Sequence, residues 1–280
     1  MQLHFTKMHG CGNDYVYLDC FRQPIPSPET LAPRLSDRHF GVGGDGIILI
    51  GPSPVADAQM RIFNIDGSEG KMCGNGIRCV AKYLYDHGYV SGDRLTVETQ
   101  SGVKSLSLTV QDGKIASVKV DMGRAILSPA AIPAALPGEA VVSRPVDIAG
   151  GSYAITCVSM GNPHCVLFWD ADVDTIDLAH LGPQFEHSPL FPERINTEFC
   201  NILPDRTIKM RVWERGSGET LACGTGACAS VVAAVENGFF QKGEPIRVQL
   251  AGGELSICYT DAGVTMQGPA TEVFEGVITL

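Results

Sequence analysis

The feature that most constrains this chain is a repeated cluster built around a cysteine. Cys73-Gly-Asn-Gly76 recurs as Cys223-Gly-Thr-Gly226, 150 positions later. Gly67-Ser-Glu69 lies just ahead of the first cluster, as Gly216-Ser-Gly-Glu219 lies just ahead of the second. A single Cys-Gly-x-Gly match in a glycine-rich chain would be uninformative, so the second pair of matching segments adds to the case for an internal repeat.

A third match fixes the interpretation. Asn13 follows Gly12 and Asn162 follows Gly161, and the two asparagines are 149 positions apart. Three clusters in one order at one offset predict two homologous halves. Two long copies are too few for a solenoid, so we expect a pseudo-symmetric pair of domains with the active site in the interdomain cleft.

Composition excludes several classes of protein. The 280 residues are 44% hydrophobic and 19% charged, as expected of a globular chain that buries a core. Thirty-one acidic residues against 21 basic ones give a formal charge of −10, and no basic stripe suggests nucleic acid as a partner. The N-terminal residues contain no apolar segment of signal-peptide length, and no stretch of the chain approaches the ~20 apolar residues of a membrane span, so we expect a cytoplasmic protein without membrane contact. The ten cysteines should then be reduced thiols.

Hydrophobic patterns predict many strands and one helix after each cysteine cluster. We expect strands at residues 46–50, 94–98, 103–110, 115–120 and, at the end of the chain, 272–280, which could pair with either domain. Ile77, Val80, Ala81 and Leu84 have helical spacing, and Gly88 predicts the helix end. Residues 227–235 are almost wholly apolar, as expected of a buried helix. The proline- and alanine-rich segment 127–145 should connect the halves or decorate one of them.

Each clustered cysteine is expected where a Gly-x-Gly turn leads into a helix. A sulfur there lies near unpaired backbone N–H groups and the positive end of the helix dipole, an environment that favours thiolate. Two such groups, one per domain, suit a reaction with a base on one face of a carbon and an acid on the other. Racemisation at an amino-acid Cα is such a reaction. No segment resembles a pyridoxal-phosphate site, so backbone amides at the helix starts would stabilise the enolate-like charge.

Two other interpretations of the cysteines are open at this level. Small buried cysteines usually serve as packing residues, and we expect that of eight of the ten, namely Cys11, Cys20, Cys79, Cys157, Cys165, Cys200, Cys228 and Cys258. A zinc site is a second possibility, but the spacings from Cys73 to Cys79 and from Cys223 to Cys228 are not those of structural zinc sites.

Seven stretches taken together resemble the diaminopimelate epimerase family over essentially the whole chain. They are His9-Gly-Cys-Gly-Asn-Asp-Tyr15, Asp37-Arg-His-Phe-Gly-Val-Gly-Gly-Asp45, Phe63-Asn-Ile-Asp-Gly-Ser-Glu69, Met72-Cys-Gly-Asn-Gly-Ile-Arg-Cys79, Gly161-Asn-Pro-His164, Trp213-Glu-Arg-Gly216 and Ala222-Cys-Gly-Thr-Gly-Ala-Cys228. The resemblance implies an α+β fold of two pseudo-symmetric domains, each a mixed, mostly antiparallel sheet or barrel wrapped around a central helix. We expect residues 1–123 with the C-terminal strand 269–280 to form one domain and 124–268 the other.

The resemblance also implies the reaction. Family members interconvert LL- and meso-diaminopimelate in the pathway to lysine and, in bacteria, to peptidoglycan precursors, with no cofactor or metal. By analogy, Cys73 and Cys223 are the acid/base pair and His164 and Glu214 tune their pKa values. The implied substrate-binding residues are Asn13, Asn64, Gly74, Asn75, Asn162, Asn196, Glu214, Arg215, Gly224 and Thr225. Diaminopimelate carries two ammonium and two carboxylate groups, which amides with one Arg and one Glu can pair. The family further implies a homodimer.

Some positions allow other interpretations. Asparagines beside Gly or Pro, such as Asn13 and Asn162, are often only turn residues. Glu214 and Arg215 could be a solvated charge pair, His164 a structural histidine, and Asp45 with its glycines a loop. Gly46 stands where many family members carry a Gln, so one side-chain contact to substrate is missing.

Two further functions compete with the first. A related two-cysteine racemase could act on histidine, proline or hydroxyproline, although Asn75 stands where proline-racemase-like sequences have His. A two-domain amino-acid-binding protein would close on its ligand without chemistry, and would give the paired cysteines no purpose.

Overall fold

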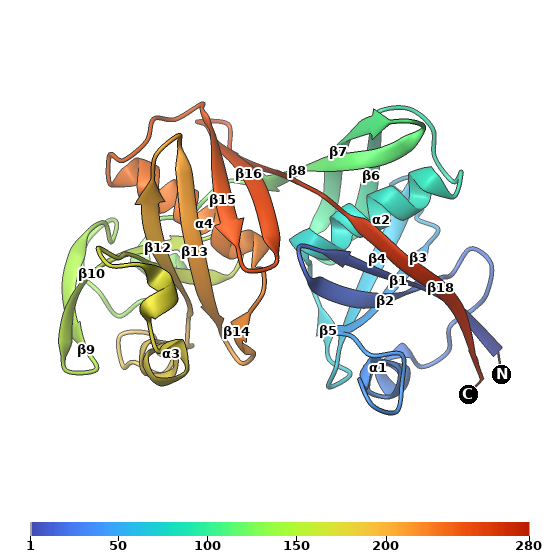
Figure 1. The fold of residues 1–280 in the computed structure, drawn as a ribbon, viewed down its shortest axis with the longest axis horizontal. Coiled ribbons are helices and arrows are strands. Elements are labelled where there is room, and N and C mark those ends of the chain that lie inside the picture. Colours follow the sequence, from blue (N-terminus) through green and yellow to red (C-terminus); the bar gives the residue numbers. More distant parts are fainter. Residues whose placement is uncertain (1, 280) are drawn as a thin grey trace. The chain divides into compact units, whose positions relative to one another are not determined.

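A computed structural model describes residues 2–279 as two compact units. Unit 1 comprises the described residues up to Asp121 together with those from Gln267 onward, and unit 2 comprises Met122–Met266. In both units, strands lie around one long helix, α2 or α4 (Figure 1).

Unit 1 contains a largely antiparallel sheet and two helices, α1 (Pro28–Ser36) and α2 (Gly74–Asp86). Its strands are β1 (Gln2–Gly10), β2 (Asn13–Asp19), β3 (Gly46–Gly51), β4 (Ala58–Asn64), β5 (Glu69–Gly70), β6 (Arg94–Thr99), β7 (Gly102–Gln111), β8 (Lys114–Gly123) and β18 (Thr271–Thr279). The pairs β2–β3 and β4–β6 are parallel. Helix α2 packs against β1, β2, β6 and β18, and α1 against β2, β3 and β4.

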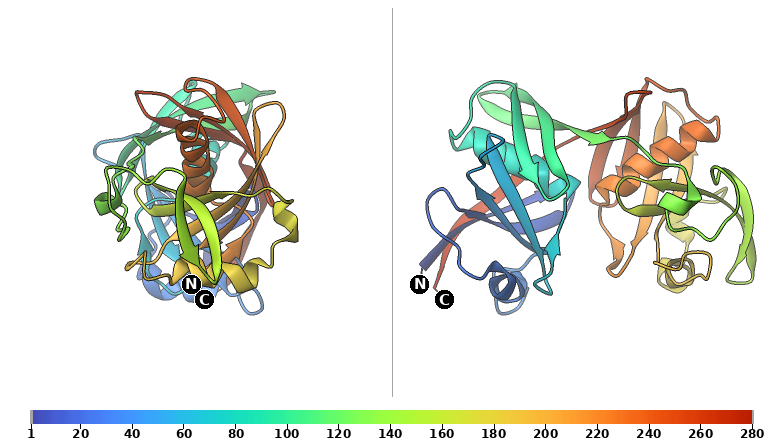
Figure 2. Two further views of the ribbon diagram at one scale, coloured as in Figure 1. Left: turned by 90° about the vertical axis from the view of Figure 1, so that its left-hand side faces the viewer. Right: turned by 180° about the vertical axis from the view of Figure 1, so that it is seen from behind.

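Unit 2 has the same plan, with α4 (Gly224–Glu236) packed against β10, β11, β12, β13, β15 and β16 (Figure 2). Its strands are β9 (Arg144–Ile148), β10 (Gly151–Ser159), β11 (Pro163–Phe168), β12 (Asn196–Leu203), β13 (Thr207–Glu214), β14 (Gly218–Thr220), β15 (Pro245–Leu250), β16 (Gly253–Tyr259) and β17 (Val264–Gly268). The remaining helices are α3 (Leu178–Glu186) and the 3₁₀ turns η1 (Pro129–Ala131) and η2 (Val173–Thr175). The pairs β11–β12 and β13–β15 are parallel.

The internal repeat is also present in the register of the paired strands. Val16 pairs with Ile47 across β2 and β3, and Cys165 pairs with Thr197 across β11 and β12. The sequence offsets between these equivalent residues are 149 and 150, as between the motif clusters. A shift of one residue would turn every side chain to the other face of the strand, so the shared register places equivalent side chains on equivalent faces.

Both central helices begin and end as the sequence predicts. Cys73 and Cys223 are the N-cap residues of α2 and α4, in extended backbone conformations. Gly88 and Gly238 follow the C-cap residues and have positive φ values of 78° and 80°, which glycine adopts without steric cost. Helix α4 is buried almost all round: within it only Thr225, Val235 and Glu236 are half-buried, and none of its residues is exposed.

The predicted strands are confirmed, with shifts of one to three residues at their ends. The C-terminal strand pairs antiparallel with β1, so it belongs to unit 1 (Figure 1). Its last predicted residue, Leu280, lies outside the described residues. Residues 127–145 decorate unit 2, where Ile132 and Val141 are buried in its core. The cysteines expected to be buried are so except Cys20 and Cys258, which are half-buried because they lie at strand ends. No helix within residues 2–279 is long and apolar enough to cross a bilayer.

One charged side chain ties α2 to its surroundings. Arg78 is fully buried, and its guanidinium donates to Gly74 O at 3.0 Å, Asn75 Oδ1 at 2.9 Å and Pro269 O at 3.1 Å. A buried cation is tolerated only when hydrogen bonds replace its hydration. Here those bonds hold the first turn of α2 and the chain that enters β18.

Arg78→Ala should therefore lower the free energy of unfolding by more than about 3 kcal/mol, because it leaves several buried acceptors without a donor and opens a cavity. Exposed Arg94 serves as the matched control, and Arg94→Ala should change stability by less than about 0.5 kcal/mol. Urea unfolding followed by circular dichroism measures both. Equal stability of the two variants would contradict the anchoring role.

Candidate active site

Cys73 lies at the start of α2, and its sulfur accepts a hydrogen bond from the backbone N–H of Gly76 at 3.3 Å. The thiol also lies 3.4 Å from Asn13 Oδ1, to which it donates. Asn13 is the first residue of β2, so the turn between β1 and β2 places this predicted site residue beside the cysteine. The sulfur is half-buried.

Asn13 is held by a cluster of charged side chains. Its amide nitrogen donates to Asp45 Oδ2 at 2.7 Å, and Arg38 forms ion pairs with Asp45 at 2.9 Å and Asp14 at 2.7 Å. Lys7 pairs with Asp14 at 2.5 Å, and the two bases hold the pKa of Asp14 below its usual value despite partial burial. Asp45 therefore orients a residue that contacts Cys73, which a plain loop would not do.

The other predicted residues of unit 1 lie in two places. Gly74 and Asn75 form the first turn of α2, where both accept hydrogen bonds from Arg78. Asn64 ends β4 and donates to Ser68 Oγ at 3.0 Å. Gly46, at the start of β3, lies opposite Asn64 in the sheet; a Cβ there would come within 2.2 Å of Phe63 O, so the backbone itself excludes a larger residue.

Cys223 has the equivalent place at the start of α4. Its sulfur accepts from Gly226 N at 3.4 Å and lies 3.5 Å from the Thr225 hydroxyl. Gly224 and Thr225 form the first turn of the helix, as Gly74 and Asn75 do in α2. The two thiols differ in burial: Cys223 is only 5% exposed, whereas Cys73 is half-buried.

The expected low thiol pKa is wrong for Cys223. Burial raises its pKa well above the ordinary thiol value, and the nearby carboxylates of Glu214 and Glu198 raise it further. Hydrogen bonds from Thr225 and Gly226 act in the opposite direction but do not compensate. Desolvation and like charge outweigh the helix dipole here, so Cys223 holds its proton in this conformation.

Glu214, the last residue of β13, is coupled to the same thiol. Burial raises its pKa, while hydrogen bonds from Thr220 and Cys223 lower it. Its neighbour Arg215 points elsewhere and donates to Glu193 O at 3.1 Å. The two residues therefore have separate partners and are not the solvated charge pair that the sequence allowed.

His164 is fully buried on β11 and has two partners. Nδ1 lies 2.7 Å from Glu198 Oε1, and Nε2 lies 3.0 Å from Asn162 Oδ1. The Asn162 amide nitrogen donates to Thr225 Oγ1 at 3.2 Å. Asn162 thus contacts the cysteine cluster through Thr225, which is more than its turn position requires. The structure brings four predicted residues together here: Asn162, His164, Thr225 and Cys223.

Asn196 supports the end of β13 from the adjoining strand. Its Nδ2 donates to Pro163 O at 2.7 Å, and its Oδ1 accepts from the backbone N–H of Arg215 at 2.9 Å. It is almost fully buried. This amide holds the Arg215 backbone in place and links β11, β12 and β13 at the edge where Cys223 lies.

Sequence reasoning missed Asp45 as an orienting residue and did not consider Glu198 at all. A signal for Glu198 was present: at the offset of 150, it falls on Ile48, in the apolar strand at residues 46–50. A charged residue where the other half has isoleucine breaks the pattern of a buried strand. The contacts of Asp45 depend on a loop conformation that no spacing predicts.

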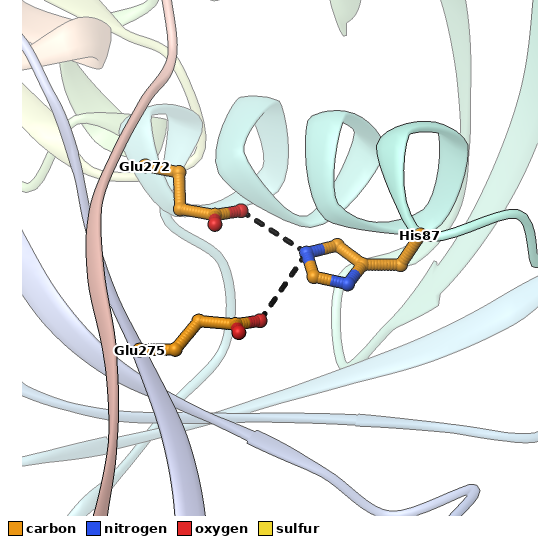
Figure 3. A group of neighbouring side chains, drawn as sticks. All are labelled: His87, Glu272 and Glu275. Carbon is orange, nitrogen blue, oxygen red and sulfur yellow. Dashed lines mark hydrogen bonds and ion pairs between the residues drawn. The ribbon is translucent and has the colours of Figure 1, made fainter.

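Within residues 2–279, one group of histidine and carboxylate side chains has the separation of metal ligands: His87, Glu272 and Glu275 (Figure 3). His87 is the C-cap residue of α2, and its Nε2 lies 3.1 Å from Glu272 and 3.8 Å from Glu275. The 13 residues of α2 separate it from Cys73 by about 20 Å. The ion pairs and stacking on Tyr83 account for its position.

Each half therefore provides one thiol at a helix start, a backbone N–H that donates to the sulfur, and a set of asparagine amides nearby. Such groups can exchange a proton with carbon and hold a carboxylate at a helix N-terminus. Unit 2 adds two carboxylates and a histidine, which unit 1 lacks at the equivalent positions Ile48, Asn64 and Tyr15.

Comparison with protein families gives a match over most of the chain. The model of the family described as diaminopimelate epimerase matches residues 5–128 and 156–273. Among curated proteins, the diaminopimelate epimerase of Acetivibrio thermocellus is 52% identical over 280 residues and covers 99% of each chain. That of Geobacillus kaustophilus is 53% identical over 277 residues, or 98% of this chain and 95% of the relative.

Solved structures share the fold at low sequence identity. A probable proline racemase from Agrobacterium radiobacter has a TM-score of 0.75 at 15% identity, covering 99% of this chain and 93% of its own. A PhzF-family phenazine biosynthesis protein from Bacillus anthracis has a TM-score of 0.72 at 15% identity and covers both chains fully. These likenesses confirm the predicted fold class.

The starts of the two helices provide a matched test of the site's packing. A Cβ at Gly226 would lie 2.5 Å from Glu198 Oε1, and one at Gly76 would lie 2.6 Å from Ile48 Cδ1. Ile48 can change rotamer, whereas Glu198 is held by His164. Gly226→Ala should therefore reduce the free energy of unfolding by about 1–3 kcal/mol, and Gly76→Ala should cost less. Thermal unfolding measures both, and a larger loss for Gly76→Ala would contradict this view of the packing.

Proposed function

The chain belongs to the diaminopimelate epimerase family, and on that premise we propose that Cys73 and Cys223 are the acid and base of its reaction. The enzyme is an isomerase that interconverts LL- and meso-diaminopimelate. The observation that carries the proposal is the equivalent placement of the two cysteines as N-caps of α2 and α4, each with a backbone N–H bonded to its sulfur. Packing alone does not require a thiol at a helix N-cap in both repeats.

In this mechanism one thiolate removes the α-proton from one face of the carbon and the other thiol donates a proton to the opposite face. The charge that develops on the substrate carboxylate is stabilised by the amides of a helix start. Because burial and two carboxylates favour the protonated form of Cys223, we assign it as the initial proton donor. Cys73 is then the initial base.

The proposed substrate-binding residues form two groups, according to the part of the substrate that each would bind. The proposed ligands of the reacting α-carboxylate are Gly74, Asn75, Gly224 and Thr225, at the helix starts. The remaining ammonium and carboxylate groups of the substrate would be bound by Asn13, Asn64, Asn162, Asn196, Glu214 and Arg215. A carboxylate and a guanidinium are suited to an ammonium and a carboxylate respectively. The substrate site is thus rich in polar groups, which fits diaminopimelate better than a proline-like ring.

The two-cysteine racemases of single amino acids are the alternative within the same fold. Similar folds occur in a probable proline racemase at 15% identity and in a hydroxyproline epimerase at 14% identity. This level supports a common fold only, whereas the diaminopimelate epimerases are half identical over the full length. When LL-diaminopimelate, histidine, proline and hydroxyproline are assayed separately as substrates, only LL-diaminopimelate should be converted. Turnover of a single amino acid without diaminopimelate would reverse the assignment.

Single substitutions test the cysteine pair. Cys73→Ala and Cys223→Ala should each lower kcat at least about 10³-fold, since each removes one general acid or base. Cys258→Ala removes a half-buried thiol on β16 and is the matched control, with kcat expected within about twofold of the unmodified enzyme. Epimerisation followed by chiral chromatography measures all three. Full activity in either of the first two variants would rule out the two-base mechanism.

We also propose, from the family, that the enzyme is a cytoplasmic homodimer. Light scattering after size exclusion should give about twice the chain mass of 29.9 kDa. A mass equal to one chain at micromolar concentration would contradict the dimer.

A further inference from the structure

Glu198 is a buried carboxylate that the proposed reaction does not yet use. It lies on β12 and is fully buried. Its Oε1 bonds to His164, whereas Oε2 is buried and makes no hydrogen bond to any of residues 2–279. An unsatisfied buried carboxylate oxygen is costly, so the fold alone gives no reason to keep one here.

The other half of the molecule shows that packing does not require this charge. Ile48 is the repeat equivalent of Glu198, and it packs below the start of α2 as Glu198 packs below the start of α4. In both units the side chain lies against the third residue after the N-cap cysteine, Gly76 or Gly226. The apolar side chain of Ile48 is sufficient to pack this position in unit 1, so the carboxylate in unit 2 has another role.

A continuous chain of hydrogen bonds leads from Glu198 to the catalytic sulfur. His164 Nδ1 lies 2.7 Å from Glu198 Oε1, and His164 Nε2 lies 3.0 Å from Asn162 Oδ1. Asn162 Nδ2 lies 3.2 Å from Thr225 Oγ1, which in turn lies 3.5 Å from Cys223 Sγ. Three side chains thus connect the buried carboxylate to the thiol through four contacts.

The donors in this chain have a definite direction. Because the Asn162 nitrogen donates to Thr225, its oxygen faces His164 and Nε2 must carry a hydrogen. Thr225 Oγ1 accepts from Asn162, so its own hydrogen is available to Cys223. An ionised Glu198 accepts a hydrogen bond from Nδ1, so both ring nitrogens donate and the ring is held from two sides. Glu198 is the partner on the Nδ1 side.

We propose that Glu198 is a positioning residue for the epimerase reaction: it fixes the orientation of the His164 ring and, through Asn162 and Thr225, the direction of the hydrogen bond that reaches Cys223. This inference rests on the proposed roles of Cys223 and diaminopimelate. Serine hydrolases show the principle, since a buried carboxylate there holds the catalytic histidine in its working orientation.

The charge of Glu198 has a second, separable effect. The titratable groups that face it are His164 and Cys165 on β11, Cys200 on its own strand, Glu214 on β13 and Cys223 at the start of α4. Its negative charge helps to raise the pKa values of Cys165, Cys200, Glu214 and Cys223. Removing the charge should lower the pKa of Cys223, so the ionisation of this thiol in the pH profile should move to lower pH.

A double-mutant cycle tests the positioning role. Glu198→Gln should lower kcat about tenfold or more and change KM by less than about threefold, because the residue acts on the thiol through other groups. Thr225→Val breaks the same series of hydrogen bonds at its last residue before Cys223. If Glu198 acts through Thr225, the double variant should lose no more than the more damaged single variant. Losses that multiply would overturn the proposal.

Asp86→Asn is the matched control. Asp86 is a buried carboxylate on α2 that pairs with Lys82 at 2.6 Å, outside the chain that leads to Cys223. Asp86→Asn should change kcat little, and the fold-loss of the double variant Glu198→Gln/Asp86→Asn should equal the product of the two single fold-losses. Coupling of Glu198 to Asp86 as strong as that to Thr225 would mean a general effect on folding and would contradict the inference.

Glu198→Asp provides a second route if the Gln variant does not fold. Aspartate keeps the charge but withdraws its oxygen by one methylene from His164. Its kcat should fall as in Glu198→Gln, while the ionisation of Cys223 stays where the unmodified enzyme has it. A kcat within twofold of the unmodified enzyme would overturn the positioning role. Inactivity of the unmodified enzyme on diaminopimelate would instead refute the proposed function, so the two failures are distinguishable.

Discussion

The bond from a backbone N–H to a cysteine sulfur at the start of a helix is the interaction on which the rest of this site depends. It occurs twice, from Gly76 to Cys73 and from Gly226 to Cys223. The second glycine of each Cys-Gly-x-Gly cluster lets the helix start lie close to the strand beneath it, Gly76 against Ile48 and Gly226 against Glu198. Each central helix, buried by the sheet around it, holds its N-cap thiol in a fixed place. The sheet and helix thus present one N-cap thiol per unit.

The two halves share a scaffold but differ in charge around the sulfur. In unit 1, Cys73 is half-buried and its neighbour Asn13 is held by Asp45. In unit 2, Cys223 is nearly inaccessible and lies among Glu214, Glu198 and the His164 chain. This asymmetry suits the proposed two-base mechanism, in which one thiol must hold a proton while the other lacks one. Duplication supplies matched geometry, and substitutions at Ile48/Glu198 and Asn64/Glu214 supply the difference.

Most of the fold could be predicted from sequence because its signals are local or repeated. Glycine at the end of each helix, the apolar spacing after Cys73 and the offset of 150 residues are all visible in the chain. The thiol pKa of Cys223 was predicted in the wrong direction, since burial and the approach of Glu198 from another strand outweigh the helix dipole. Asp45 and Glu198 escaped notice because their roles arise from contacts 32 and 34 residues away along the chain, to Asn13 and His164. Such contacts depend on strand register and loop conformation.

The most direct test of the central claim, two thiols acting on one carbon, is the position of the label when LL-diaminopimelate is epimerised in deuterated water. With two bases, the substrate's proton leaves to one sulfur while the product receives a deuteron from the other. At early times the meso product should therefore carry deuterium at the inverted carbon, and the unreacted LL substrate should carry almost none. A single base would return its proton or deuteron to either face, so equal labelling of substrate and product would contradict the account.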